Sequence, residues 1–151
     1  MFKKHLSNLP DRINYDYVRY ICPCCGYPTL DSEGEYDICI ICNWEDDGQG
    51  DHNVDKVLGG SNGKYSLTHA RENFKKYLCM YKPGEDMRMT GGDRQEEIEL
   101  KKELIIAYKT IEDYSNLRKY KKEYRKVLEL EHLLHEIRKK RINEYTNSIN
   151  K

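Results

Sequence analysis

Two Cys-x-x-Cys pairs constrain this chain more than any other feature of its sequence. The first pair is Cys22 and Cys25, the second is Cys39 and Cys42, and thirteen residues separate the pairs. Four thiolates at this spacing are typical of one tetrahedral metal site, and zinc prefers such an all-cysteine shell in closed, structural sites. The spacing therefore predicts a single metal centre held by these four side chains.

The metal is predicted to be structural. A zinc ion with four thiolate ligands keeps no open position for water, unlike the zinc of catalytic sites. Iron is the alternative metal, but thirteen residues are far fewer than lie between the two cysteine knuckles of rubredoxins. We favour zinc over iron. Because no credible pair of nucleophile and base stands elsewhere in the sequence, we expect no enzymatic activity.

The segments around the cysteines predict a small β-hairpin. Tyr15–Ile21 is aromatic and β-branched, and Glu35–Ile41 places Tyr36 and Ile38 on one face. Between them, residues 31–34 form a turn-rich tetrad, Asp-Ser-Glu-Gly. Each cysteine pair would then lie at the end of a strand, which is the layout of a zinc ribbon.

The rest of the chain predicts helices. Ser66 offers an N-cap for a short helix from Leu67 to about Met80. Residues 94–151 contain no Pro or Gly, and their apolar side chains recur mostly at steps of three, four and seven. A break at residues 113–116 would give an antiparallel helical hairpin, and a single long helix is the alternative. The basic residues of segment 94–151, Lys101 and Arg141 among them, are expected on the solvated side of the helices.

The predicted fold class is therefore α+β, a zinc-ribbon-like β-hairpin module with a packed short helix followed by a C-terminal α-helical hairpin. With 151 residues, 38% hydrophobic and 34% charged, the chain can bury only a modest core, so a metal cross-link makes physical sense. The predicted divisions are a polar lead-in (1–14), the cysteine-rich domain (15–83), a linker (84–93) and the helical extension (94–151).

Two further features are candidates for function. Cys24 lies between two predicted ligands, where it is either an inert side chain, which we favour, or a reactive thiol. Trp44, Glu45, Asp46 and Asp47 follow the second pair directly. They form a candidate partner-binding surface, or else Trp44 covers the small core beneath the metal, which is the interpretation we favour for that residue.

Charge and hydropathy bear on partners and compartment. Through Asp93 the chain has 11 Lys/Arg and 15 Asp/Glu, and from Arg94 onward it has 15 and 11. Acidic residues around the cysteines would repel phosphates, so nucleic acid is a minority prediction. No apolar run is long enough to span a bilayer, and the N-terminus lacks the apolar region of a signal peptide. We expect a cytoplasmic protein whose thiols stay reduced.

The order of the motifs is also informative. It runs Cys22-Pro-Cys-Cys-Gly-Tyr27, Tyr36-Asp-Ile-Cys39, Cys42-Asn-Trp-Glu-Asp-Asp47 and Gly59-Gly-Ser-Asn62. This order, over about residues 20–78, resembles the cysteine-rich CPCC domain of bacterial proteins. Asn43 stands where such knuckles carry Gly, but Asn tolerates a left-handed backbone. The resemblance implies a metal-binding, zinc-ribbon-like module with no established enzymatic activity.

The resulting hypothesis is a non-enzymatic bacterial zinc protein in which the metal stabilises a surface that binds a protein partner. A thiol-redox or metal-responsive protein acting through Cys24 and a nucleic-acid-binding ribbon are the alternatives.

Overall fold

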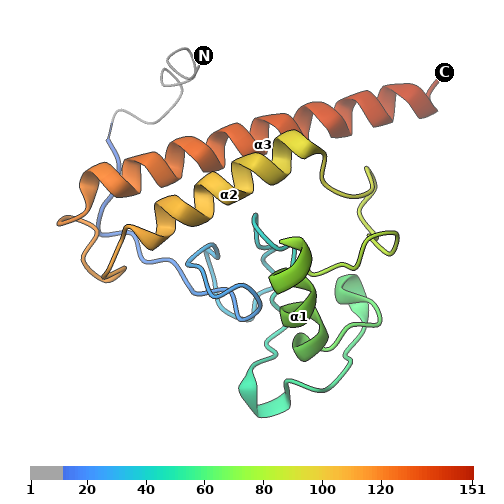
Figure 1. Cartoon of the computed structure of the whole chain (residues 1–151), viewed down its shortest axis with the longest axis horizontal. Helices are drawn as coiled ribbons and strands as arrows, with labels where there is room; N and C mark the ends of the chain where they lie inside the picture. The colour runs from blue at the N-terminus through green and yellow to red at the C-terminus, as the bar shows by residue number, and fades with distance from the viewer. Residues whose placement is uncertain (1–11) are drawn as a thin grey trace. The chain divides into compact units, whose positions relative to one another are not determined.

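The computed structural model describes residues 12–151, so the first eleven residues of the predicted lead-in lie outside the described part. The chain divides into two compact units. We call residues 18–92 the cysteine unit, and residues 12–17 together with 93–151 the helical unit. Figure 1 traces both along the chain.

The cysteine unit contains little regular structure. Its elements are two short 3-10 helices, η3 (Asp51–Asn53) and η4 (Gly60–Asn62), and one α-helix, α1 (Leu67–Tyr77). The β-pairing among the described residues consists of two isolated bridges, one between Tyr20 and Leu30 and one between Ile38 and Glu45. The predicted β-hairpin is therefore wrong, and with it the α+β class, because the described part of the chain is essentially helical.

Local hydrogen bonds explain why the two cysteine segments do not pair with each other. Tyr20 and Leu30 exchange backbone hydrogen bonds of 2.8 and 3.1 Å, which closes the first segment on itself. The second segment closes through the Cys39 N–H, which donates to the Trp44 carbonyl at 2.9 Å. Tyr36 has a φ of 66°, a left-handed conformation that interrupts the predicted second strand.

Helix α1 begins as the sequence predicts and ends earlier. The Ser66 hydroxyl accepts the His69 N–H at 3.2 Å, which caps the first turn. Leu78 is left-handed, with a φ of 55°, and its N–H donates to the Phe74 carbonyl. This C-cap stops the helix at Tyr77, short of the predicted end.

The helical unit is a two-helix hairpin. Helix α2 (Gln95–Lys109) and helix α3 (Lys121–Ile149) run antiparallel, and the loop between them contains the predicted break at 113–116 (Figure 1). The chain thus forms two helices here instead of one. The seam between them buries Leu104, Tyr108, Val127, Leu130 and Leu134.

Residues 12–17 belong to this unit through side chains. Asp16 pairs with Arg118, whose Nε lies 2.8 Å from the carboxylate. The rings of Tyr15 and Tyr124 meet edge to face, with centroids 6.1 Å apart. The predicted strand Tyr15–Ile21 is therefore divided between the two units, which is a second reason why it does not form.

A buried charge cluster joins α2 to α3. Lys101 and Glu97 are fully buried, and Lys101 Nζ lies 2.6 Å from Asp93. Glu97 accepts the Arg94 N–H at 2.8 Å and pairs with Arg141, which is 8% exposed. The expectation that Lys101 and Arg141 lie on the solvated side is wrong, because acidic partners let both side chains enter the interior.

Among the described residues, none of the helices is apolar and long enough to cross a membrane.

Candidate metal centre

Two similar loops carry the four predicted ligands. In the first, the Gly26 N–H donates to the Cys22 carbonyl at 2.9 Å, and in the second the Asn43 N–H donates to the Cys39 carbonyl at 2.9 Å. Gly26 and Asn43 both have positive φ, 81° and 65°. The same tight turn therefore presents each cysteine pair, and Asn43 takes the left-handed conformation that was expected of it.

The four sulfurs meet at one point. The Sγ atoms of Cys22, Cys25, Cys39 and Cys42 all lie within 4.8 Å of one another. Cys22 lies 3.6 Å from Cys42, and Cys25 lies 3.6 Å from Cys39. A tetrahedral ion with Zn–S bonds of about 2.3 Å separates its sulfurs by about 3.8 Å. The donor set therefore fits one thiolate-bound metal ion.

The surroundings of the sulfurs are closed and supply hydrogen bonds. Cys22, Cys39 and Cys42 are fully buried, and Cys25 is half-buried. The Thr29 hydroxyl donates to Cys39 Sγ at 3.0 Å, and the Trp44 N–H points at Cys42 Sγ at 3.5 Å. Such contacts orient thiolate ligands and stabilise their charge.

The thiol pKa values show how closely the sulfurs interact. Burial, followed by hydrogen bonds from the neighbouring thiols, raises the pKa of Cys25 well above its usual value. For Cys39, burial opposes ionisation, but hydrogen bonds with Cys22, Cys25 and Cys42 outweigh it and lower the pKa. Four thiolates this close together need a cation between them, which a metal ion supplies.

The segment after the second pair is mostly turned inward. Trp44 is fully buried and Asp46 is 4% exposed. Asp46 accepts the Gly34 N–H at 2.7 Å and the Gly48 N–H at 3.4 Å. Of the four residues predicted as a partner-binding surface, only Glu45 and Asp47 are half-buried and reach solvent.

Acidic and amide side chains form hydrogen bonds with the backbone of the loops near the metal centre. Asp37 accepts the N–H groups of Asp31 and Ser32 at 3.0 and 2.9 Å. Asn62, 2% exposed, accepts the Glu45 N–H at 3.0 Å and donates to the Glu45 carbonyl at 2.8 Å. The sequence analysis did not predict these roles, although Asn62 next to Gly63 is a recognisable signal for loop hydrogen bonding.

The other two cysteines lie outside the four-sulfur group. Cys24 is 7% exposed, and its hydrogen bond with Cys42 is one of the causes that raise the pKa of Cys42, after burial. Cys79 is 6% exposed, with the Arg88 guanidinium 3.8 Å from its sulfur. All six cysteines are free of disulfide bonds.

Comparison with known proteins identifies this unit. Residues 20–91 match the model of a family described as cysteine-rich CPCC, which confirms the resemblance of the motifs and extends it to Gly91. No curated protein and no solved structure matches the chain. The match ends before α2, so the helical hairpin lies outside it.

Proposed function

We propose that this chain, whose residues 20–91 form a cysteine-rich CPCC domain, is a non-enzymatic zinc-binding protein that acts by binding a protein partner. The observation that carries the proposal is the cluster of four sulfurs within 4.8 Å of one another. Zinc suits an all-thiolate set in a closed site, and iron is the less favoured alternative.

The role proposed for zinc is structural. A bound zinc ion supplies cross-links between the two cysteine loops, worth about 10–16 kcal/mol in small zinc modules. The cysteine unit needs such a contribution because its only α-helix is α1, with 11 residues, and no sheet forms among its described residues. A closed shell of four thiolates leaves the ion no place for a substrate, which supports a non-enzymatic role.

Exposed apolar side chains beside the ligands support partner binding. Val18 and Ile21 precede Cys22 and are 69% and 58% exposed, and Tyr36 and Ile38 precede Cys39 and are 64% and 60% exposed. Large apolar side chains left exposed on a small unit favour an interaction surface. Because residues 18–92 carry 12 Asp/Glu and 8 Lys/Arg, we propose a partner with an apolar and basic face.

The two alternatives have less support. A redox role for Cys24 requires access for an oxidant, but that side chain is 7% exposed. The excess of carboxylates in the cysteine unit opposes nucleic-acid binding. The free thiols are suited to a reducing compartment, and we propose the bacterial cytoplasm.

Metal analysis of the purified chain tests the proposal. We expect about one equivalent of zinc per chain, and we expect Cys39→Ser to lose most of it. Cys79→Ser is the matched control, because it removes a buried thiol outside the four-sulfur group and should keep the metal. Protein without stoichiometric metal, or equal loss in both variants, would contradict the proposal.

A further inference from the structure

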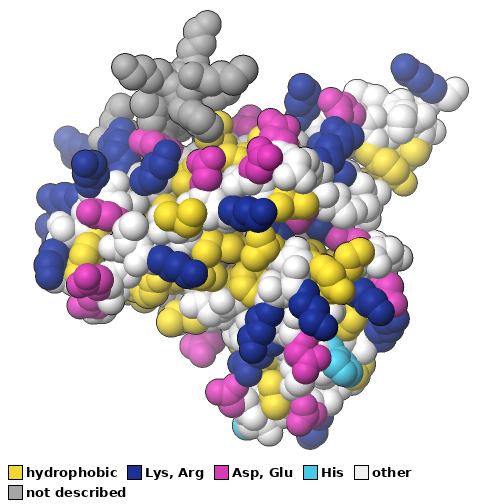
Figure 2. All heavy atoms as spheres, in the orientation of Figure 1, with side chains coloured by type: hydrophobic (Ala, Val, Ile, Leu, Met, Phe, Trp, Pro, Cys, Tyr) yellow, Lys and Arg dark blue, Asp and Glu magenta, His cyan; other side chains and the backbone are white. Residues whose placement is uncertain are grey.

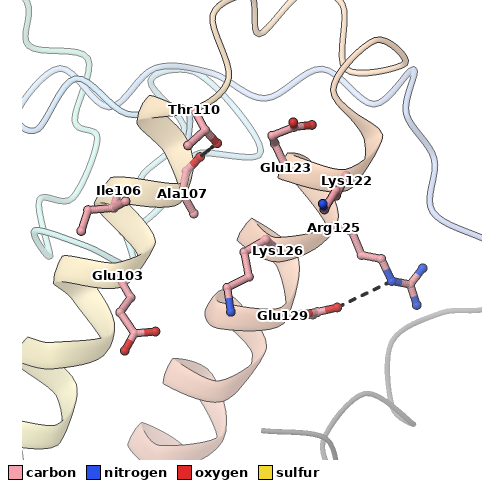
Figure 3. Close-up of a pocket in the computed structure, with 9 residues that line it drawn as sticks. All are labelled: Glu103, Ile106, Ala107, Thr110, Lys122, Glu123, Arg125, Lys126 and Glu129. Carbon is pink, nitrogen blue, oxygen red and sulfur yellow. Dashed lines mark hydrogen bonds and ion pairs between the residues drawn. The ribbon is translucent and has the colours of Figure 1, made fainter.

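An open groove of about 590 Å³ lies between α2 and α3, towards the loop that joins them (Figure 3). Ile106, 63% exposed, and Ala107 give it an apolar side. Its charged residues are of both signs in equal number: Glu103, Glu123, Glu129, Lys122, Arg125 and Lys126. A nucleic acid or an anionic membrane would be repelled by half of this lining, whereas a protein surface that also carries both signs can match it.

Figure 2 shows charged side chains of both signs along the helices, with hydrophobic side chains between them. On α3 this mixture follows helical spacing. Residues at steps of three and four share one face and are exposed or half-buried: Lys126, Glu129, Leu133, Ile137, Lys140 and Glu144. We call this set the outer stripe. It differs from the buried seam with α2, to which Val127 and Leu134 belong.

The outer stripe is complementary to itself when reversed. In a symmetric antiparallel pair of α3 helices with its two-fold axis beside His135, a residue a given number of positions before 135 faces the residue the same number of positions after 135 on the second helix. Lys126 then faces Glu144 of the second helix, and Leu133 faces Ile137. Glu129 comes beside Lys140 in the same arrangement. In a parallel pair, Lys126 would face Lys126 and Glu144 would face Glu144, so the charges favour the antiparallel pair alone.

The groove and the outer stripe share residues. Lys126 and Glu129 belong to both, and Figure 3 shows them on α3, with Glu129 directed toward Arg125. In the antiparallel pair, the segment around Glu144 of the second helix runs past Lys126, and therefore along the groove. One arrangement thus places the second helix along the α3 side of the groove and matches the charges of α3.

We propose that two copies of this chain associate through α3, antiparallel about a two-fold axis near His135, with the groove of each copy covered by the C-terminal part of the other α3. The ion pairs that Glu144 and Glu129 make within one chain compete only weakly. Glu144 lies 3.9 Å from Arg94, and Glu129 lies 3.6 Å from Arg125, in exposed or partly exposed pairs of small energetic value. The association needs no metal and is independent of the function proposed for the cysteine unit.

Charge reversal with rescue tests the arrangement. We expect the chain to be a dimer by sedimentation equilibrium. Lys126→Glu and Glu144→Lys each place like charges opposite one another at both ends of the pair, and should raise the dissociation constant about tenfold or more. The double variant should restore it. The two positions are 18 residues, or about 27 Å, apart on one helix, so rescue can arise only between copies.

Lys139→Glu is the matched control. Lys139 is exposed on α3 and lies outside the outer stripe, so the same charge reversal should leave the dimer intact. Circular dichroism checks that each variant keeps its helices, as expected for exposed positions. A monomeric parent chain, a dimer unaffected by the single reversals, or a double variant that stays weakened would overturn the proposal.

Discussion

Asp46 shows how a single carboxylate organises the loops next to the metal centre. It is 4% exposed, and its two oxygens accept the N–H groups of Gly34 and Gly48. A buried carboxylate that accepts backbone hydrogen bonds contributes more than its charge, because its removal leaves buried donors without an acceptor. Asp46 therefore stabilises the loops of the cysteine unit from the interior and is not part of an exposed partner-binding surface.

We expect Asp46→Ala to lower the free energy of unfolding of the cysteine unit by about 1–3 kcal/mol. Urea unfolding of the metal-loaded protein, followed by tryptophan fluorescence, measures the change. Glu33→Ala, at an exposed position in the adjoining turn, is the matched control and should stay within about 0.5 kcal/mol of the parent. A loss of the same size in both variants would contradict the role of Asp46.

Asn43 allows a second test at the scale of one residue. Its φ of 65° strains any side chain that cannot stabilise a left-handed backbone. Asn43→Gly should keep or slightly raise stability, whereas Asn43→Val should lower it by about 1–2 kcal/mol. The same urea experiment distinguishes them, and a Val variant as stable as the Gly variant would show that the turn can relax.

The residues that the sequence predicts well are those whose signal is local. Spacing alone predicts the four clustered cysteines, Cys22, Cys25, Cys39 and Cys42. The left-handed backbone of Asn43 is predicted from its position in the turn. The roles of Asn62 and Lys101 depend on partners that are 17 and 8 residues away in the chain. Composition and periodicity do not reveal such pairings, so the sequence predicts Lys101 on the solvated side and no role for Asn62.

At the scale of elements, the incorrect hairpin has a similar cause. Residues 35–41 do alternate as a strand would, but alternation does not specify which segment a strand pairs with. The left-handed Tyr36 and the hydrogen bond from Cys39 to the Trp44 carbonyl commit the backbone to its own loop. The two helices of the hairpin were easier to predict, because a 3.6-residue period over many turns is a stronger signal than one short alternating run.

The charge cluster between α2 and α3 yields a prediction at this scale. Glu97 is fully buried, pairs with Arg141 and accepts the N–H of Arg94 at the start of α2. Glu97→Ala removes all of these contacts and leaves Arg141 buried without that carboxylate. We expect a loss of about 3–5 kcal/mol in the stability of the hairpin, measured by thermal unfolding at 222 nm.

Glu99→Ala is the control for this prediction. Glu99 lies on the same helix but is exposed, and its partner is the amide of Gln95. It should lose no more than about 0.5 kcal/mol. Equal melting curves for the two variants would mean that the buried cluster does not stabilise the hairpin.

At the scale of the whole molecule, the two units differ in what stabilises them. The helical unit has an apolar seam and a buried charge cluster, whereas the cysteine unit has a small buried core beside its four clustered thiols. The chain has one tryptophan, Trp44, which is fully buried in the cysteine unit. Its fluorescence therefore reports on that unit alone, while most helical residues belong to α2 and α3.

Removal of the metal should therefore unfold the cysteine unit and leave the helical unit folded. With a strong chelator and a reductant, the emission of Trp44 should shift to longer wavelength, while most of the helical circular dichroism stays. Re-addition of zinc should reverse the shift. Simultaneous loss of both signals would show that the hairpin depends on the cysteine unit, and no change in either would contradict a structural metal.

The similarity of the two cysteine loops has a consequence for the order of folding. Each loop is closed by a hydrogen bond over four residues, from Gly26 to Cys22 and from Asn43 to Cys39. Both turns can therefore form while the rest of the chain is still unfolded, and bringing them together closes a loop of only thirteen residues. Metal capture would then be an early, local step in the folding of the cysteine unit.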